Sequence, residues 1–189
     1  MRIGILALQG AFAEHSTMLR SLDSDTFYIR KKNDLDNTMN GMVIPGGEST
    51  TMRKLLNDMG MVEPVRSLIE SGLPVMGTCA GAILLAEEIQ GNDACLATIP
   101  MTIQRNAYGR QLGSFTVSSE FEGCGRIPMR FIRAPVIESV GKDVRPIASV
   151  DNRIVAARYD DQLAMTFHPE ISGDTRVHEY FLRVCRDAS

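Results

Sequence analysis

The sequence predicts an α/β fold with three layers: a mostly parallel central sheet with helices on both of its faces. Two observations predict it. Short apolar runs alternate with amphipathic segments through the first half of the chain, and turn residues such as Gly and Pro follow several of these runs. No internal repeat, low-complexity tract or linker interrupts the 189 residues. We therefore expect a single domain that spans residues 1–189.

The first half is expected to supply the parallel part of the sheet. Apolar or β-branched runs predict strands at residues 3–8, 26–29, 42–44 and 74–77. Apolar residues at helical spacing predict helices at residues 11–22, from about 50 to 59, at 61–71, and from 82–86 on to a stop at Gly91. Ser49 or Thr50 is the expected N-cap of the second helix.

The pattern changes after residue 100. Short strands separated by turns are expected at residues 112–117, 129–133, 136–140, 145–150, 153–158 and 162–167. Some of them should extend the sheet, and others should form an antiparallel flank. A last helix is expected over residues 174–186, with apolar side chains on one face.

Composition excludes several classes of function. Lys and Arg number 20 and Asp and Glu 23, a net charge of −3, and no basic tail is present, so we expect no nucleic-acid partner. No apolar run approaches the ~20 residues of a membrane span, and the first one is too short for a signal peptide, so we expect no membrane contact and a cytoplasmic location. The cysteines and histidines lack metal-ligand spacing, so we expect no metal.

A candidate nucleophile lies in the sequence Gly-Thr-Cys-Ala-Gly at residues 77–81, between a predicted strand and a predicted helix. This is the Gly-x-nucleophile-x-Gly turn, where side chains in place of the glycines would collide with backbone. The N-terminal end of the helix favours the Cys79 thiolate and offers the N–H of Ala80 to an oxyanion. The alternative is a buried, inert cysteine. The other cysteines lack this setting: Cys95, Cys124 and Cys185.

A candidate base follows the last predicted strand, in the sequence Phe-His-Pro-Glu at residues 167–170. His168 would leave the sheet at the carboxyl end of a strand, the edge where Cys79 also lies. In an extended chain, residues two apart point the same way, so Glu170 can hold one ring nitrogen of His168. The alternative is a solvated pair on a surface loop. We expect His15 and His178, both in predicted helices, to be helix or interface residues rather than catalytic ones.

A second strand-to-helix turn has the sequence Pro-Gly-Gly-Glu-Ser at residues 45–49. Its glycines let the backbone approach a ligand closely, and the N–H of Gly47 can complete an oxyanion hole with that of Ala80. The alternative is an ordinary turn in which Ser49 only caps a helix.

These segments resemble class I glutamine amidotransferase domains, which combine a cysteine elbow with a distant His-x-Glu. The closer resemblance is to the glutaminase subunits of pyridoxal 5′-phosphate synthase. It is carried by residues 7–11 with Glu14 and His15, and by residues 45–51, 77–81, 104–111, 131–135 and 167–170. The resemblance implies a flavodoxin-like fold of the class I glutamine amidotransferase type.

The resemblance also implies roles for individual residues. Cys79 would be the nucleophile, with His168 and Glu170 as its partners in a catalytic triad. Contacts with L-glutamine are implied at Gly47, Glu48, Ser49, Arg105, Ile132 and Arg133. An arginine suits the α-carboxylate of glutamine, and a glutamate suits its α-ammonium. The expected reaction is hydrolysis of L-glutamine to L-glutamate and ammonia through a glutamyl thioester.

A partner is implied as well: the (β/α)₈-barrel synthase subunit, in a hetero-oligomeric complex that uses the ammonia for vitamin B6 biosynthesis. Pyridoxal 5′-phosphate would be the product of the complex and not a prosthetic group of this chain. We expect weak glutaminase activity until the synthase docks, and the turn at Gln9 and Gly10 lies where docking can order the oxyanion hole. The alternatives are the glutaminase subunit of another amidotransferase, a cysteine hydrolase of the protease or deglycase type, and a non-catalytic regulatory subunit.

Overall fold

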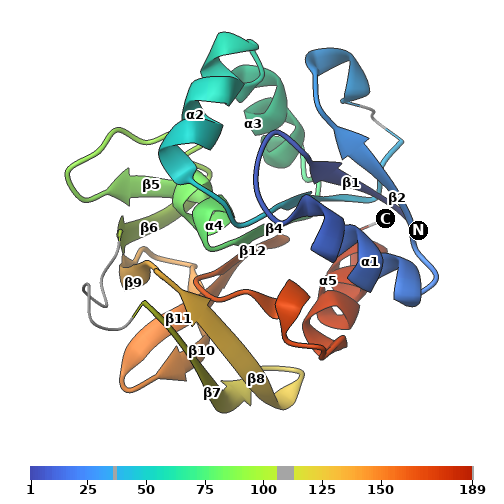
Figure 1. Ribbon diagram of the computed structural model, residues 1–189. Helices are drawn as coiled ribbons and strands as arrows, with labels where there is room; N and C mark the ends of the chain where they lie inside the picture. Colours follow the sequence, from blue (N-terminus) through green and yellow to red (C-terminus); the bar gives the residue numbers. More distant parts are fainter. Residues whose placement is uncertain (36–37, 106–112, 189) are drawn as a thin grey trace.

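The structure is a computed structural model that describes residues 1–35, 38–105 and 113–188. The expected α/β fold is confirmed: helices pack against a twelve-stranded sheet (Figure 1). The strands are β1 (Arg2–Leu6), β2 (Asp25–Ile29), β3 (Gly41–Ile44), β4 (Val75–Thr78), β5 (Ala86–Ile89), β6 (Ile99–Gln104), β7 (Ser114–Phe121), β8 (Gly125–Ile132), β9 (Val136–Val140), β10 (Arg145–Val150), β11 (Arg153–Tyr159) and β12 (Gln162–Met165). The helices are α1 (Phe12–Ser21), α2 (Ser49–Asp58), α3 (Val62–Glu70), α4 (Ala80–Leu85) and α5 (Arg176–Asp187), with short 3₁₀ turns η1 (Lys32–Asp34) and η2 (Pro169–Ile171).

The parallel half of the sheet has the order β2-β1-β3-β4-β12. This is the flavodoxin-like doubly wound order, with its switch point between β1 and β3. In such sheets ligands bind beyond the carboxyl ends of the strands, at the switch point. The chain leaves β1, β3, β4 and β12 at that edge, so the segments that follow these strands are brought together.

The other half of the sheet is largely antiparallel and continues from β12 through β11, β10, β7 and β8. A branch formed by β9, β6 and β5 joins through β9 and β11, with β5 and β6 parallel to each other. Figure 1 shows β7 and β8 as a long hairpin below the parallel half. The expectation that the later strands partly extend the sheet and partly form an antiparallel flank is therefore confirmed.

Helices cover both faces of the parallel half, as expected. Successive residues of a strand point to opposite faces, and in β3 Met42 and Ile44 belong to one apolar core whereas Val43 belongs to the other. The first core contains side chains of α2, α3 and α4, and the second contains side chains of α1 and α5. Strands buried on both faces need apolar residues at every position, which explains the continuous apolar runs of the sequence.

Two expectations in the middle of the chain are wrong. The helix that begins after Cys79 ends at Leu85 and does not continue to Gly91, because the next residues form β5. Its partner β6 lies in a segment for which no strand was expected. The sequence Ala-Glu-Glu-Ile favours a helix locally, but pairing with β6 overrides that preference. The N–H of Leu96 donates to the carbonyl oxygen of Leu84, and the N–H of Thr98 donates to that of Leu85. These carbonyl oxygens need outside donors because the helix ends there.

The hairpin strands also differ from their expected lengths. β7 and β8 run well past the expected ranges 112–117 and 129–133, and they meet at a turn around Glu122 to Cys124. Alternating exposed and half-buried residues of β7 give a weaker apolar signal than a buried strand does. The expected start of the first strand, residue 112, lies outside the described residues, as do residues 106–111 of the segment that carries part of the family resemblance.

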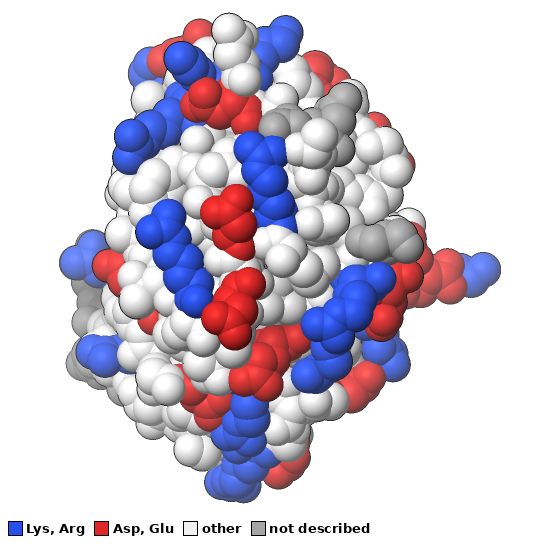
Figure 2. Space-filling model, turned by 90° about the vertical axis from the view of Figure 1, so that its right-hand side faces the viewer, with Lys and Arg blue, Asp and Glu red and all other residues white. Residues whose placement is uncertain are grey.

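The outer surface carries charges of both signs. On the side of the molecule seen in Figure 2, Lys and Arg side chains of the described residues are interspersed with Asp and Glu. In the part of the chain that the structure describes, no helix has the length and apolar character needed to cross a bilayer.

Candidate active site

One cavity of about 570 Å³ opens at the carboxyl edge of the parallel strands. Its wall contains every residue that the sequence suggested for the site except Glu170: Gly47, Glu48, Ser49, Cys79, Ala80, Arg105, Ile132, Arg133 and His168. Gln9, Gly10 and Ala11, from the turn after β1, complete one side. Six separate segments of the chain therefore converge on one volume that is large enough for a small amino acid.

Cys79 lies on the strained turn that the sequence predicted. Its φ of 49° is in the left-handed region, which residues other than glycine seldom adopt. The turn is held by the N–H of Cys79, which donates to the carbonyl oxygen of Met165 in β12 at 2.7 Å. A Cβ on Gly81 would lie 2.0 Å from the carbonyl oxygen of Ile44, and one on Gly77 would lie 2.8 Å from the carbonyl carbon of Gly81. Both glycines are thus required by close approach of backbone.

His168 and Glu170 meet behind the cysteine. The Nδ1 of His168 lies 2.6 Å from the Oε1 of Glu170, so the carboxylate accepts a hydrogen bond from the ring. The expected contact is present, but the reason given for it is wrong, since Glu170 lies in the 3₁₀ turn η2 and not in an extended chain. Glu170 is only 5% exposed and lies behind the imidazole, outside the cavity wall.

The imidazole of His168 is brought to the sulfur of Cys79. The thiol lies close enough to the imidazole to raise its pKa, and because Nδ1 is bound to Glu170, Nε2 is the ring nitrogen left for the sulfur. A Cβ on Gly46 would lie 2.4 Å from the ring Cε1 and 3.4 Å from the Cβ of Cys79, so both groups flank the same glycine. The structure therefore joins a thiol, an imidazole and a carboxylate in series.

Electrostatics favour the charged imidazole. Burial alone would lower the pKa of His168, but the hydrogen bonds to Cys79 and Glu170, together with the negative charges of both partners, raise it to about 10. Burial alone would raise the pKa of Glu170, but the neighbouring His15 and the bond from His168 lower it below its usual range. The pair is therefore an imidazolium and a carboxylate at neutral pH.

The glycine turn after β3 is locked to the turn after β1. The N–H of Ala11 donates to the carbonyl oxygen of Gly46 at 2.9 Å, and the N–H of Glu48 donates to the Oε1 of Gln9 at 2.7 Å. Gly10 has a φ of 103°, and a Cβ there would lie 1.9 Å from the same carbonyl oxygen of Gly46. In a trans peptide the N–H of Gly47 points opposite to the carbonyl of Gly46, so the turn at Gln9 and Gly10 sets its direction.

The N-cap of α2 is Glu48 and not the expected Ser49 or Thr50. Its carboxylate accepts from the N–H of Thr50 at 3.1 Å and from that of Thr51 at 2.8 Å, and both threonine hydroxyls donate to it as well. The pKa of Glu48 falls to about 2, and the hydrogen bond from the Thr50 hydroxyl is the largest cause. Burial acts in the opposite direction and raises the pKa. A carboxylate near a helix N-terminus is further favoured by the helix dipole.

Arg105 pairs with Glu48 in the cavity wall, with its guanidinium 3.2 Å from the Oε1 of Glu48. Another part of the wall comes from the end of β8, where the chain turns sharply. Arg133 has a φ of 44°, and its N–H donates to the carbonyl oxygen of Gly113 at 2.7 Å. Ile132 just before it is 36% exposed, the one large apolar side chain that is exposed among the described residues.

Two histidines that the sequence did not mark as functional lie directly behind the site. His15 and His178 are in the expected helices, but both are fully buried. The Nε2 of His15 lies 3.4 Å from the Oε2 of Glu170. The local signal that could have found His15 is its place four residues after the turn at Gly10 and Ala11, inside a segment that carries the family resemblance. His178 gave no such signal.

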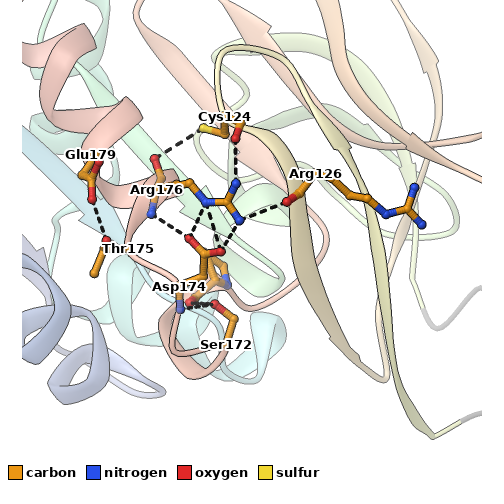
Figure 3. Close-up of polar contacts among 8 residues, drawn as sticks. Cys124, Arg126, Ser172, Asp174, Thr175, Arg176 and Glu179 are labelled. Atoms are coloured by element: carbon orange, nitrogen blue, oxygen red, sulfur yellow. Dashed lines mark hydrogen bonds and ion pairs between the residues drawn. The ribbon is translucent and has the colours of Figure 1, made fainter.

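A polar cluster fixes the segment that follows Glu170 (Figure 3). The guanidinium of Arg176 donates to the carbonyl oxygens of Cys124 at 2.9 Å and Arg126 at 3.0 Å, and it pairs with Asp174 at 2.5 Å. The Sγ of Cys124 in turn lies 3.4 Å from the carbonyl oxygen of Arg176. The start of α5 is thereby tied to the tip of the β7–β8 hairpin, which limits how far η2 and Glu170 can move.

Cys95, Cys124 and Cys185 lie outside the cavity wall, and no disulfide joins any of the four cysteines. Burial raises the pKa of Cys95 to about 11 and that of Cys185 to about 12, so both are protonated and unreactive at neutral pH. Among the described residues, no group of three or more His, Cys, Asp or Glu side chains could hold a metal ion.

Comparison with known proteins gives one consistent family. The SNO glutamine amidotransferase family matches residues 5–187. A protein of Methanocorpusculum labreanum named pyridoxal 5′-phosphate synthase subunit PdxT is 57% identical over 184 residues, which cover 97% of each chain. A protein of Streptococcus pneumoniae with the same name is 52% identical and covers 99% of this chain and 98% of its own. A crystal structure described as a glutamine amidotransferase superposes with a TM-score of 0.93 at 42% identity, covering 97% of this chain and 98% of the other.

Proposed function

The chain belongs to the SNO glutamine amidotransferase family, and we propose that it is the glutaminase subunit of a pyridoxal 5′-phosphate synthase. It hydrolyses L-glutamine to L-glutamate and ammonia, and it does so as a single domain that spans the chain. The names of relatives that are 52–57% identical over nearly the whole chain support the assignment. The observation that carries the chemistry is the series Cys79–His168–Glu170, whose first two side chains line one cavity.

In the form that attacks glutamine, Cys79 is a thiolate and His168 is an imidazolium. The pKa of His168, raised to about 10, supports the protonated ring. A thiolate is the reactive form of cysteine, and the proton on the imidazole is then ready for a leaving group. Glu170 keeps the ring oriented through Nδ1 and stabilises its positive charge.

In the first half of the reaction, the sulfur of Cys79 attacks the side-chain amide carbon of glutamine. The carbonyl oxygen becomes an oxyanion, which the backbone N–H groups of Gly47 and Ala80 bind. His168 donates its Nε2 proton to the amide nitrogen, the carbon–nitrogen bond breaks, and ammonia leaves. A glutamyl thioester and a neutral imidazole remain.

In the second half, the neutral His168 takes a proton from water, and the oxygen attacks the thioester carbon. The same N–H groups bind the second oxyanion. Collapse of this intermediate breaks the carbon–sulfur bond and releases glutamate, which restores the thiolate and the imidazolium.

Recognition of free glutamine falls to the remaining wall of the cavity. Glutamine carries an α-ammonium and an α-carboxylate, and the wall offers a carboxylate on Glu48 and guanidinium groups on Arg105 and Arg133. Because Glu48 and Arg105 already form an ion pair, each can bind the opposite charge of a zwitterion without being left unpaired. Gly47, Ser49 and Ile132 contact the uncharged part of the substrate.

The partner is the synthase subunit, a (β/α)₈ barrel that receives the ammonia in a hetero-oligomeric complex. The hydrogen bonds between the turn at Gln9 to Ala11 and the turn at Gly46 to Glu48 support control of the oxyanion hole by docking. A partner that moves the first turn must also move the Gly47 N–H. We propose that the isolated chain is weakly active, that the synthase stimulates it, and that the complex is cytoplasmic, which suits a chain whose four cysteines form no disulfide.

The test is ammonia release from glutamine, measured with and without the cognate synthase. Wild-type chain should be slow alone and faster in the complex, and a Cys79→Ala variant should show no release above background in either case. Cys124→Ala is the matched control, because Cys124 lies outside the cavity, and it should keep the wild-type rate. A glutamine-like electrophile should label Cys79 alone, as seen by peptide mass spectrometry. Ammonia release by Cys79→Ala at the wild-type rate would refute the proposal.

A further inference from the structure

A buried polar cluster lies behind the catalytic series, and the proposed mechanism does not use all of it. It contains side chains from four elements: His15 of α1, Thr78 at the end of β4, Glu170 of η2 and His178 of α5. Each of them is at most 5% exposed, and none belongs to the cavity wall. Figure 1 shows α1 and α5 side by side, the two helices that bring the histidines together.

The side chains of this cluster form a continuous series of contacts. The Nδ1 of His15 lies 3.0 Å from the Nε2 of His178, and the Nε2 of His15 lies 3.1 Å from the Oγ1 of Thr78. The same Nε2 is 3.4 Å from the Oε2 of Glu170, which is long for a hydrogen bond but close for a charge facing an N–H group. Among the described residues, Oε2 has no hydrogen-bond partner. His15 is therefore the polar group that faces the second oxygen of this buried carboxylate.

The positions of the acceptors decide which nitrogen of His15 carries the proton. With the proton on Nε2, the N–H faces the carboxylate oxygen and the hydroxyl of Thr78, and Nδ1 accepts from the Nε2–H of His178. With the proton on Nδ1, the lone pair of Nε2 would face a carboxylate oxygen, and His178 would have to carry its own proton on Nδ1. That atom is buried and has no partner among the described residues. A buried donor without a partner is costly, so the first arrangement is favoured.

We propose that His15 is a positioning residue of the glutaminase: its Nε2–H holds Glu170 with Oε1 turned toward His168. The inference rests on the proposed function and deepens it, because His15 acts on the reacting atoms only through Glu170 and His168. It turns the series of three groups into a series of five, which runs from Cys79 through His168, Glu170 and His15 to His178.

The charges around His15 agree with this role. Burial is the largest cause that lowers the pKa of His15, and the positive charge of His168 lowers it further. The nearby carboxylates of Glu170 and Glu14 act in the opposite direction. Burial also lowers the pKa of His178 to about 3. Both rings are thus neutral at physiological pH, as the N–H donor arrangement requires. A neutral His15 favours ionised Glu170 through the N–H that faces Oε2, and not through a positive charge. Without His15, Glu170 should take up a proton more readily and support the His168 imidazolium less.

Two substitutions separate positioning from packing. His15→Phe keeps a ring but removes the N–H, whereas the amide of His15→Gln retains an N–H donor for Glu170 and Thr78. We expect His15→Phe in the complex to lower kcat for glutamine hydrolysis by about 10- to 100-fold, the usual effect of removing an orienting partner, with little change in KM. The acidic limb of its kcat/KM profile should move to higher pH. His15→Gln should recover most of the rate. Ser16→Ala is the control on the same helix, and it should leave the profile unchanged, since Ser16 binds Thr26 and not the cluster.

A measurement on the resting wild-type complex keeps the proposal testable if His15→Phe fails to fold. Nitrogen NMR of ¹⁵N-histidine-labelled chain reports which ring nitrogen carries the proton. The proposal requires the Nε2–H form of neutral His15, and the Nδ1–H form would overturn it. An unchanged pH profile in a folded His15→Phe variant would overturn it too. Failure of the wild-type complex to hydrolyse glutamine would instead count against the proposed function, which leaves the two failures distinguishable.

Discussion

The backbone N–H of His168 donates to the carbonyl oxygen of Arg130 in β8 at 2.8 Å. His168 follows β12, a strand of the parallel half of the sheet, but its backbone is hydrogen-bonded to the antiparallel hairpin. Cys79, by contrast, is fixed by β12 itself, through the carbonyl oxygen of Met165. Cys79 and His168 are thus held by different halves of the sheet, and their alignment depends on how those halves join.

The first prediction concerns the carboxylate of the triad. Glu170→Gln keeps the size of the side chain but removes the charge that stabilises the His168 imidazolium. We expect kcat for glutamine hydrolysis in the complex to fall by about 10²- to 10⁴-fold, as for the orienting carboxylate of a serine protease. Glu179→Gln in α5 is the control, since Glu179 contacts Thr175 and lies outside the cavity. A rate for Glu170→Gln close to that of wild type would contradict the role given to the carboxylate.

The second prediction concerns the glycines of the elbow. In Gly81→Ala the new Cβ would meet the carbonyl oxygen of Ile44 at 2.0 Å, and the obstacle is backbone of a buried strand. We expect the free energy of unfolding in urea to fall by about 2 kcal/mol or more, because overpacking a core forces the backbone to shift. Gly113→Ala meets nothing within 4 Å and should be nearly neutral. Equal stability of the two variants would count against a tight approach of α4 to β3.

The third prediction concerns Glu48, which joins helix capping to the cavity. Glu48→Ala should destabilise the chain by about 1 kcal/mol, the usual cost of losing an N-cap, and raise KM for glutamine. The lowered pKa of Glu48 means that this stability is present above its ordinary pKa and is lost as pH falls toward about 2. Glu63→Ala in α3 is the control: Glu63 pairs with Arg66 away from the cavity and should leave KM unchanged. An unchanged KM in Glu48→Ala would separate the cap from substrate binding.

The fourth prediction concerns acid stability. The pKa of His178 is lowered to about 3, and burial is the largest cause. The folded chain therefore keeps His178 neutral at pH values at which the unfolded chain binds a proton. Stability should therefore fall as pH drops below about 6.5, the ordinary value for histidine, and continue to fall toward about 3. Urea midpoints measured between pH 7 and pH 4 should show this slope, and His178→Phe should flatten it. If the two slopes were equal, the unfolding would not be linked to His178.

Local sequence patterns were enough to predict the elbow and the strands that bear it. A nucleophile between glycines needs a particular turn, and runs of apolar residues need burial on both faces of a sheet, so Cys79 and the parallel strands could be read from neighbouring residues. The helix expected up to Gly91 was wrong for the complementary reason. Residues 86–89 favour a helix by themselves, and only pairing with β6, ten or more residues away, makes them a strand.

The sequence by itself determined which groups the proposed chemistry uses, because the thiol, the imidazole and the carboxylate each lie in a short pattern with its own backbone requirement. Only the tertiary structure decided what surrounds them. Glu48 rather than Ser49 caps α2, and His15 contacts His178 across 163 positions behind Glu170. The periodicity of a helix shows which of its faces is buried, whereas the identity of the group on the far side of the contact depends on the path of the whole chain.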